Sequence, residues 1–132
     1  MNLLPNIQAA ATVTQLNLLG NANGNGTVLD LQTYKGPVTI LLAVGQSTVG
    51  VGTIDTANIQ HSANNTAAEF ADVSGGAFTA VVNSANASNV GIQAKSFDTR
   101  GLLRYLRVPL VISGTNANVP VQVLAIGQKQ TI

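Results

Sequence analysis

The sequence predicts an all-β fold, an antiparallel β-sandwich of the jelly-roll or immunoglobulin-like type with an N-terminal arm or edge strand. The first observation is that about seven to nine short segments rich in β-branched and apolar residues follow one another, with turn signals roughly every 8–15 residues. The second is that no window combines a sustained helical period with capping residues. The third is that a parallel sheet needs crossover helices, and the chain has no room for several of them.

The candidate strands take up most of the chain between its two ends. The run from Val38 to Val44 is typical of a buried strand, because its β-branched and apolar residues are bounded by glycines. A turn is expected at residues 35–37, and Pro109 indicates an edge or a bulge. The candidate strands are residues 11–18, 27–31, 38–44, 53–62, 69–73, 78–82, 90–98, 103–113 and 119–127.

Three regions are expected along the chain. Residues 1–26 hold no charged side chain and end in a tract of glycine and asparagine at residues 20–26. Because these two residue types tolerate positive φ angles, residues 1–26 are interpreted as an arm or edge strand followed by a flexible joint. Residues 27–127 are expected to form the β-sandwich domain, and residues 128–132 a loose tail.

The balance of charge and hydrophobicity narrows the function classes. Hydrophobic residues make up 45% of the 132 residues and charged residues 8%, against about 25% charged in typical soluble domains, so the chain is expected to fold. So little charge protects weakly against association, which suggests that copies of the chain or a partner cover much of the surface. The net charge of +1 comes without a basic stripe, which argues against nucleic acid as a partner. The sequence shows neither a secretory signal nor a run of about 20 apolar residues, so a membrane is not expected as a partner.

The side chains that could act in catalysis or bind a metal or cofactor do not form a recognisable site, so the chain is not expected to be an enzyme. His61 is the single histidine and neighbours Ser62, but adjacent residues on a strand point to opposite faces, so this histidine cannot activate that serine. The five acidic residues are scattered, and nothing singles out a pair that would hydrolyse glycosides. One histidine without cysteine gives no zinc site, and the spacing of a calcium loop is missing.

A basic cluster is the one local charge signal, with Arg100, Arg104 and Arg107 in a short stretch. One interpretation is a salt bridge from Asp98 to Arg100 beside an exposed strand face. The other is an ion pair between subunits, because the planar guanidinium group suits rigid paired contacts at an interface. The sequence leaves both open. The candidate contacts between subunits are Asp30, Asp72, Arg100, Arg104 and Arg107.

Several short motifs occur in a fixed order over residues 26–127. The longest is GTVLDLQTYKG at residues 26–36, which fits a G-T-x-x-D-L-x-x-Y-x-G pattern. The others are IQHSA at 59–63, FADV at 70–73, FDTR at 97–100, RYLRV at 104–108, VISGT at 111–115 and LAIG at 124–127. In this order and spacing the motifs resemble a family of small tailed-phage virion proteins of the capsid decoration or cement type.

The resemblance implies a β-sandwich on the outside of a phage head, made in the cytoplasm of the bacterial host. The implied partners are the major capsid protein and further copies of the chain, with a trimer favoured at the local threefold positions of the lattice. Two alternatives are a tail or head–tail joining component and a carbohydrate-binding module for host attachment. Against the second, aromatic residues make up only 4% of the chain and tryptophan is absent, whereas sugars commonly stack on aromatic faces.

Overall fold

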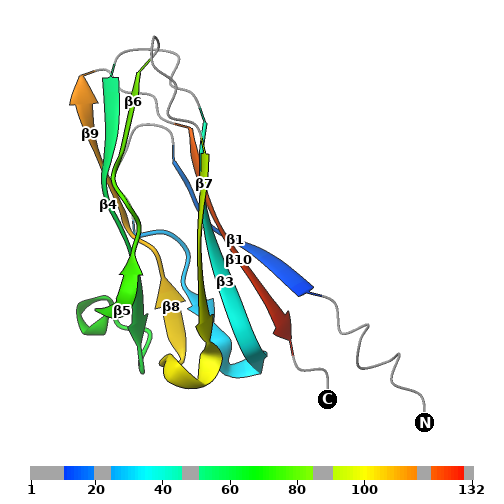
Figure 1. Ribbon diagram of the computed structural model, residues 1–132. Helices are drawn as coiled ribbons and strands as arrows, with labels where there is room; N and C mark the ends of the chain where they lie inside the picture. The colour runs from blue at the N-terminus through cyan, green and yellow to red at the C-terminus, as the bar shows by residue number, and fades with distance from the viewer. Residues whose placement is uncertain (1–10, 20–24, 46–50, 85–90, 116–119, 130–132) are drawn as a thin grey trace.

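The chain folds as two antiparallel β-sheets packed face to face, which confirms the predicted all-β sandwich (Figure 1). The computed structural model describes residues 11–19, 25–45, 51–84, 91–115 and 120–129. In these ranges the helical pieces are three single 3-10 turns, η1 (Leu31–Thr33), η2 (Ala67–Glu69) and η3 (Thr99–Gly101).

One sheet has four strands in the order β1-β10-β3-β7. They are β1 (Ala11–Leu19), β10 (Val121–Lys129), β3 (Tyr34–Val44) and β7 (Gly91–Asp98). Because β1 pairs with β10, the N-terminal strand forms one edge of this sheet, and β7 forms the other. The sheet therefore takes in residues on both sides of the expected 27–127 domain. Residues 20–24 of the expected joint and 130–132 of the expected tail lie outside the described residues.

The second sheet is organised around β4 (Val51–Ser62). On one side of β4, β5 pairs with its C-terminal part and β6 with its N-terminal part. On the other side, β8 pairs with the C-terminal part and β9 with the N-terminal part. β2 pairs with β8 at the edge of the sheet. These strands are β2 (Leu29–Asp30), β5 (Ala71–Ala77), β6 (Val81–Ser84), β8 (Tyr105–Arg107) and β9 (Leu110–Thr115). The register of β4 shifts between Ile54 and Thr56 and again between Asn58 and Gln60, so this strand is bulged.

The core lies between the sheets and is filled from alternate strand positions. In β3, Val38, Ile40, Leu42 and Val44 are buried while the residues between them stay partly exposed, as the two-residue period of a strand requires. β10 shows the same alternation. The described core residues are Leu29, Leu31, Tyr34, Val38, Ile40, Leu42, Val44, Ile54, Ala57, Ile59, Val73, Phe78, Leu106, Val108, Leu110, Val121, Val123 and Ala125.

Among the strand boundaries that differ from the expectation, three have local reasons. The turn expected at residues 35–37 is a bulge inside β3, where Gly36 has a φ of 75° and the register with β10 shifts. The strand expected at residues 103–113 breaks at Pro109, which has no amide hydrogen, and its two halves pair with β4 as β8 and β9. The strand expected at residues 69–73 begins at Ala71 and continues to Ala77, because the positive φ of Gly75 lets its backbone bulge instead of turning away.

Candidate functional site

The outer surface of the β2-β8-β4-β5 sheet carries a row of polar side chains, and we call the surface formed by Asn58, Gln60, Asp72 and Arg107 the polar face. The row crosses three strands because Gln60 is in register with Asp72 on one side and with Arg107 on the other. The Asp72 carboxylate accepts hydrogen bonds from Asn58 Nδ2 at 3.0 Å and from Gln60 Nε2 at 2.8 Å. Gln60 Oε1 accepts one from Arg107 Nε at 2.9 Å, and the Arg107 guanidinium lies 4.2 Å from the centre of the Phe70 ring. The row thus ties Asp72 and Arg107 to partners in their own chain.

Asp30 and Arg104 form an ion pair beside the polar face, with 2.8 Å between Oδ2 and Nη2. They meet because β2 pairs with β8, which sets Asp30 opposite Tyr105. Asp30 also caps η1 by accepting the backbone N–H of Gln32 at 2.9 Å. The hydrogen bond from Arg104 holds the pKa of Asp30 below its ordinary value of 3.8. Each side chain is 44% exposed, so solvent screens the pair.

Asp98 and Arg100 repeat this arrangement at the end of β7. The Asp98 carboxylate caps η3 by accepting the backbone N–H of Arg100 at 2.9 Å, and it also accepts from Nη2 of the same residue at 2.8 Å. The hydrogen bonds from Arg100 lower the pKa of Asp98 to about 2. The salt bridge that the sequence suggested between these two residues is therefore confirmed.

The five residues expected at a contact between subunits lie in three separate places. Arg100 lies in η3, and Arg104 pairs with Asp30 between β8 and β2. Asp72 and Arg107 belong to the hydrogen-bonded row of the polar face. All five have partners within one chain, so a role between subunits stays a prediction for them.

The outer surface of the other sheet is different, and we call it the uncharged face. It is the outward side of β10, β3 and β7 over residues 121–127, 38–44 and 91–96, and it carries no charged side chain in these ranges. Its polar side chains are Thr39, Ser96 and Gln122, and the two hydroxyls bond each other at 2.7 Å. Its apolar side chains are Leu41, Ala43, Ile92, Ala94, Leu124 and Ile126.

Leu41 lies at the centre of the uncharged face, in register with Leu124 on one side and Ala94 on the other. This face was not expected from the sequence, although β3 contains a signal for it. Residues 40–44 are apolar at odd and even positions alike, a pattern typical of a strand that is covered on both faces. The face as a whole depends on which strands lie beside β3, and the residue pattern of a single strand does not show that.

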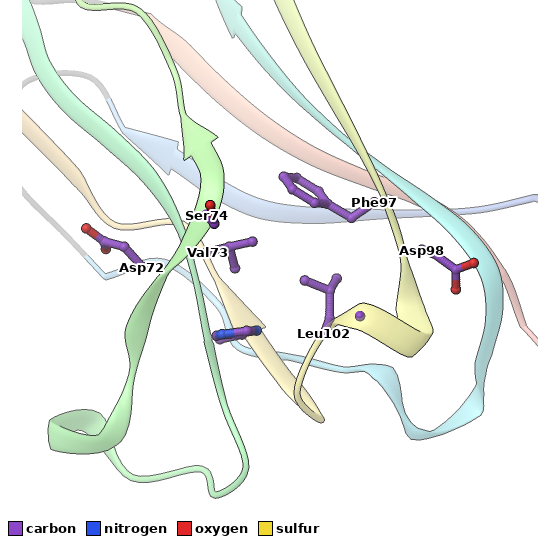
Figure 2. A pocket seen from close by; sticks show the side chains of 8 residues that line it. Asp72, Val73, Ser74, Phe97, Asp98 and Leu102 are labelled. Carbon is purple, nitrogen blue, oxygen red and sulfur yellow. The ribbon is translucent and has the colours of Figure 1, made fainter.

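An open cavity of about 460 Å³ lies between the two sheets, beside β5 and η3 (Figure 2). Figure 2 shows Val73, Phe97 and Leu102 pointing toward one another across this space, whereas the carboxylates of Asp72 and Asp98 point away from it. Those carboxylates are held by the polar face and by η3 respectively. The cavity is therefore a gap at an open side of the sandwich, and neither of the two carboxylates points into it.

His61 lines the same cavity and is held by the backbone, because its Nδ1 accepts the N–H of Leu103 at 3.2 Å. Ser62 is 1% exposed, and its hydroxyl accepts the N–H of Asn64 at 3.2 Å. His61 is in register with Leu106 of the core and Ser62 with Tyr105, so the two side chains point to opposite faces, as the sequence predicts. Among the residues that the structure describes, no group of three or more acidic, histidine or cysteine side chains could hold a metal ion.

The described part of the chain contains no helix with the length and hydropathy needed to cross a bilayer. A comparison with models of known protein families finds no match, and a comparison with curated proteins finds none either. What the chain does is therefore inferred from its motifs and from the geometry of its two outer faces.

Proposed function

We propose that this chain is a structural protein of a tailed-phage particle and acts as a capsid decoration protein that binds the outer surface of the head lattice. The observation that carries the proposal is the ordered set of motifs over residues 26–127, which resemble a family of small phage virion proteins. The β-sandwich of the chain is compatible with the fold that this resemblance implies.

The two outer faces support a role in contact rather than in catalysis. The charged side chains of the polar face and of the neighbouring pair of Asp30 and Arg104 are held by partners in their own chain. The uncharged face presents apolar and neutral polar side chains, which can be buried against another protein without stranding a charge. A protein that is copied many times on a lattice needs contact surface of this kind.

Cement function would follow from mass action. A protein that binds the assembled lattice and not the separate subunits stabilises the lattice, by about 2.7 kcal/mol per site at a concentration of one hundred times Kd. Such stabilisation needs no reactive side chain in the decorating protein.

The test is to mix the purified chain with mature heads of its own phage that lack it. We expect a fixed number of bound copies per lattice unit and heads that withstand higher temperature. Absence of binding to heads, together with presence of the chain in purified tails, would contradict the proposal and favour a tail or head–tail joining role.

A carbohydrate-binding role is the other alternative, and a glycan array tests it. On the polar side of the sandwich, the Phe70 and Tyr105 rings already have guanidinium groups 4.2 and 4.9 Å from their centres, from Arg107 and Arg104. These contacts occupy aromatic surface on which a sugar would stack, so we expect no hits. Specific glycan binding without head binding would replace the decoration proposal.

A further inference from the structure

We propose that the uncharged face is the contact between two copies of this chain, which pack back to back through β10, β3 and β7. The inference goes beyond the proposed function, because it names the surface through which copies meet. It holds whether or not the chain decorates a phage head.

β3 has apolar residues on both of its sides, but within the described chain only one side is covered. Leu42 and Ile40 point into the core and are fully buried. Leu41, between them, points outward and stays partly exposed, as does Ala43. A strand with one solvated face normally alternates apolar with polar residues, whereas a run without alternation is typical of strands buried on both sides. The outward side of β3 is therefore suited to a second layer.

Among the described residues, charge borders this face at one end only, where Asp98 follows Ser96 on the outward side of β7 and Lys35 lies opposite Gln128 of β10. Lys95 of β7 faces the inside, with its ammonium 5.9 Å from the centre of the Phe78 ring. Lys129 at the end of β10 lies 5.7 Å from the centre of the Tyr34 ring. A strongly charged partner would find no counter-charge here and would lose the hydration of its own groups. A second copy of the same face brings no charge and leaves none unpaired.

The size of the face suits a weak contact. Three strands about 4.8 Å apart and about eight residues long at roughly 3.4 Å per residue make a surface of about 390 Å² even when taken as flat. Two copies would therefore bury about 800 Å² in total, which is below the standard size of specific interfaces and in the range of weak, transient ones. Ile92, 70% exposed at the β7 edge, would gain the most from such a cover.

A face that meets the same face of another copy relates the two copies by a twofold axis. The expected unit is therefore a dimer, whereas the family resemblance favours a trimer. The two expectations separate by mass, since a dimer has twice the 13.5 kDa of one chain.

The test is light scattering after size-exclusion chromatography of the wild-type chain and of Leu41→Glu over about 10–500 µM, the range suited to an interface of this size. We expect a dimer for the wild type. Leu41→Glu should weaken the dimer by about a hundredfold or more, because it buries an unpaired carboxylate at the centre of the contact. Val111→Asp is the matched control, since Val111 is 42% exposed on the outward side of β9, and it should leave the dimer intact.

Ile92→Asp is a second variant that tests the contact without disturbing the fold, because a side chain that is 70% exposed in the single chain contributes little to its stability. It should weaken the dimer about tenfold while circular dichroism stays unchanged. A monomeric wild type, a trimer, a dimer that persists in Ile92→Asp, or equal loss in Val111→Asp would each overturn the inference. None of these outcomes bears on head binding, so failure here is distinct from failure of the proposed function.

Discussion

The polar face and the uncharged face belong to one sandwich, yet their outward side chains differ in charge and in the partners that hold them. On the polar face, Gln60 links Asp72 to Arg107 across three strands, so the charges are held in place by neighbours in the chain. On the uncharged face, Leu41 lies between Leu124 and Ala94, and no charged side chain points outward over residues 38–44, 91–96 and 121–127. The ion pairs and the hydrogen-bonded row thus tie their charged groups to the chain itself, and the uncharged face is the surface that we propose for contact.

The difference is visible within single strands. In β4 the outward residues Asn58 and Gln60 are polar and alternate with buried Ala57 and Ile59, as expected for a sheet with one face in water. In β3 the outward Leu41 interrupts that alternation. The same backbone geometry therefore carries a solvated surface in one sheet and a surface suited to burial in the other.

The largest expected effect is a loss of stability when a side chain on the core side of β3 is shortened. Leu42→Ala should lower the free energy of unfolding by about 2–5 kcal/mol, because Leu42 is fully buried and the substitution leaves a cavity. Leu41→Ala, one position along, should cost about 1 kcal/mol in the monomer. Urea unfolding at a concentration that keeps both variants monomeric measures the two losses. Equal losses would mean that β3 does not present one side to the core and the other to a partner.

The next effect concerns the polar face. Arg107→Ala should lower the free energy of unfolding by about 1–2 kcal/mol, because it removes the hydrogen bond to Gln60 and the contact with the Phe70 ring. Arg107→Lys should recover only part of this, since an ammonium group lacks the planar fork that makes both contacts at once. Thermal unfolding of the two variants side by side measures the difference.

Arg100→Ala is the control for that series, because its side chain is 88% exposed and its one ion pair is local. Its melting temperature should stay close to that of the wild type. If Arg100→Ala destabilised the chain as much as Arg107→Ala, the hydrogen-bonded row would have no special part in ordering the polar face.

The smallest effect is expected from acid. The pKa of Asp30 lies below 3.8 because Arg104 donates to its carboxylate, and that of Asp98 lies at about 2 because Arg100 does the same. Since the unfolded chain binds these protons more readily, the stability from both pairs is present above about pH 4 and is lost as pH falls from about 4 toward 2. The loss should be small, because both pairs are exposed to solvent. Melting temperatures from pH 6 to pH 2 should show a shallower decline in an Arg100→Gln, Arg104→Gln double variant, and an unchanged decline would remove these pairs as its cause.

The sequence predicted much of the fold because the two-residue period is local. In β3 and β10 buried and partly exposed residues alternate, as the strand period requires, but apolar residues on both sides of these strands leave the core side open in the sequence. A glycine or a proline accounts for the three boundary changes described above. Gly36 and Gly75 have positive φ angles, which occur both in bulges and in turns. Whether such a glycine forms a bulge or a turn therefore depends on the strand that pairs with it, as β10 pairs with β3 on both sides of Gly36.

The candidate site was harder to predict because it depends on contacts between distant segments. The bridge between Asp98 and Arg100 is local and was predicted, whereas the pair of Asp30 with Arg104 exists only because β2 lies beside β8. Low charge over the whole chain suggested a covered surface but not its place. The place proposed above depends on β3 lying between β10 and β7, which brings three outward rows of mostly apolar side chains together.

The most direct test of the difference between the two faces uses cysteine labelling, because the chain contains no cysteine of its own. Ile92→Cys puts a thiol on the uncharged face, and Val111→Cys puts one on the outward side of β9 as a comparison. The rate of reaction with a maleimide is measured for each as the protein concentration is raised through the range of dimer formation. We predict that the thiol at position 92 reacts more slowly as concentration rises while the thiol at position 111 keeps its rate. Equal rates at both positions over the whole range, or slowing at position 111 alone, would contradict the claim that copies meet through the uncharged face.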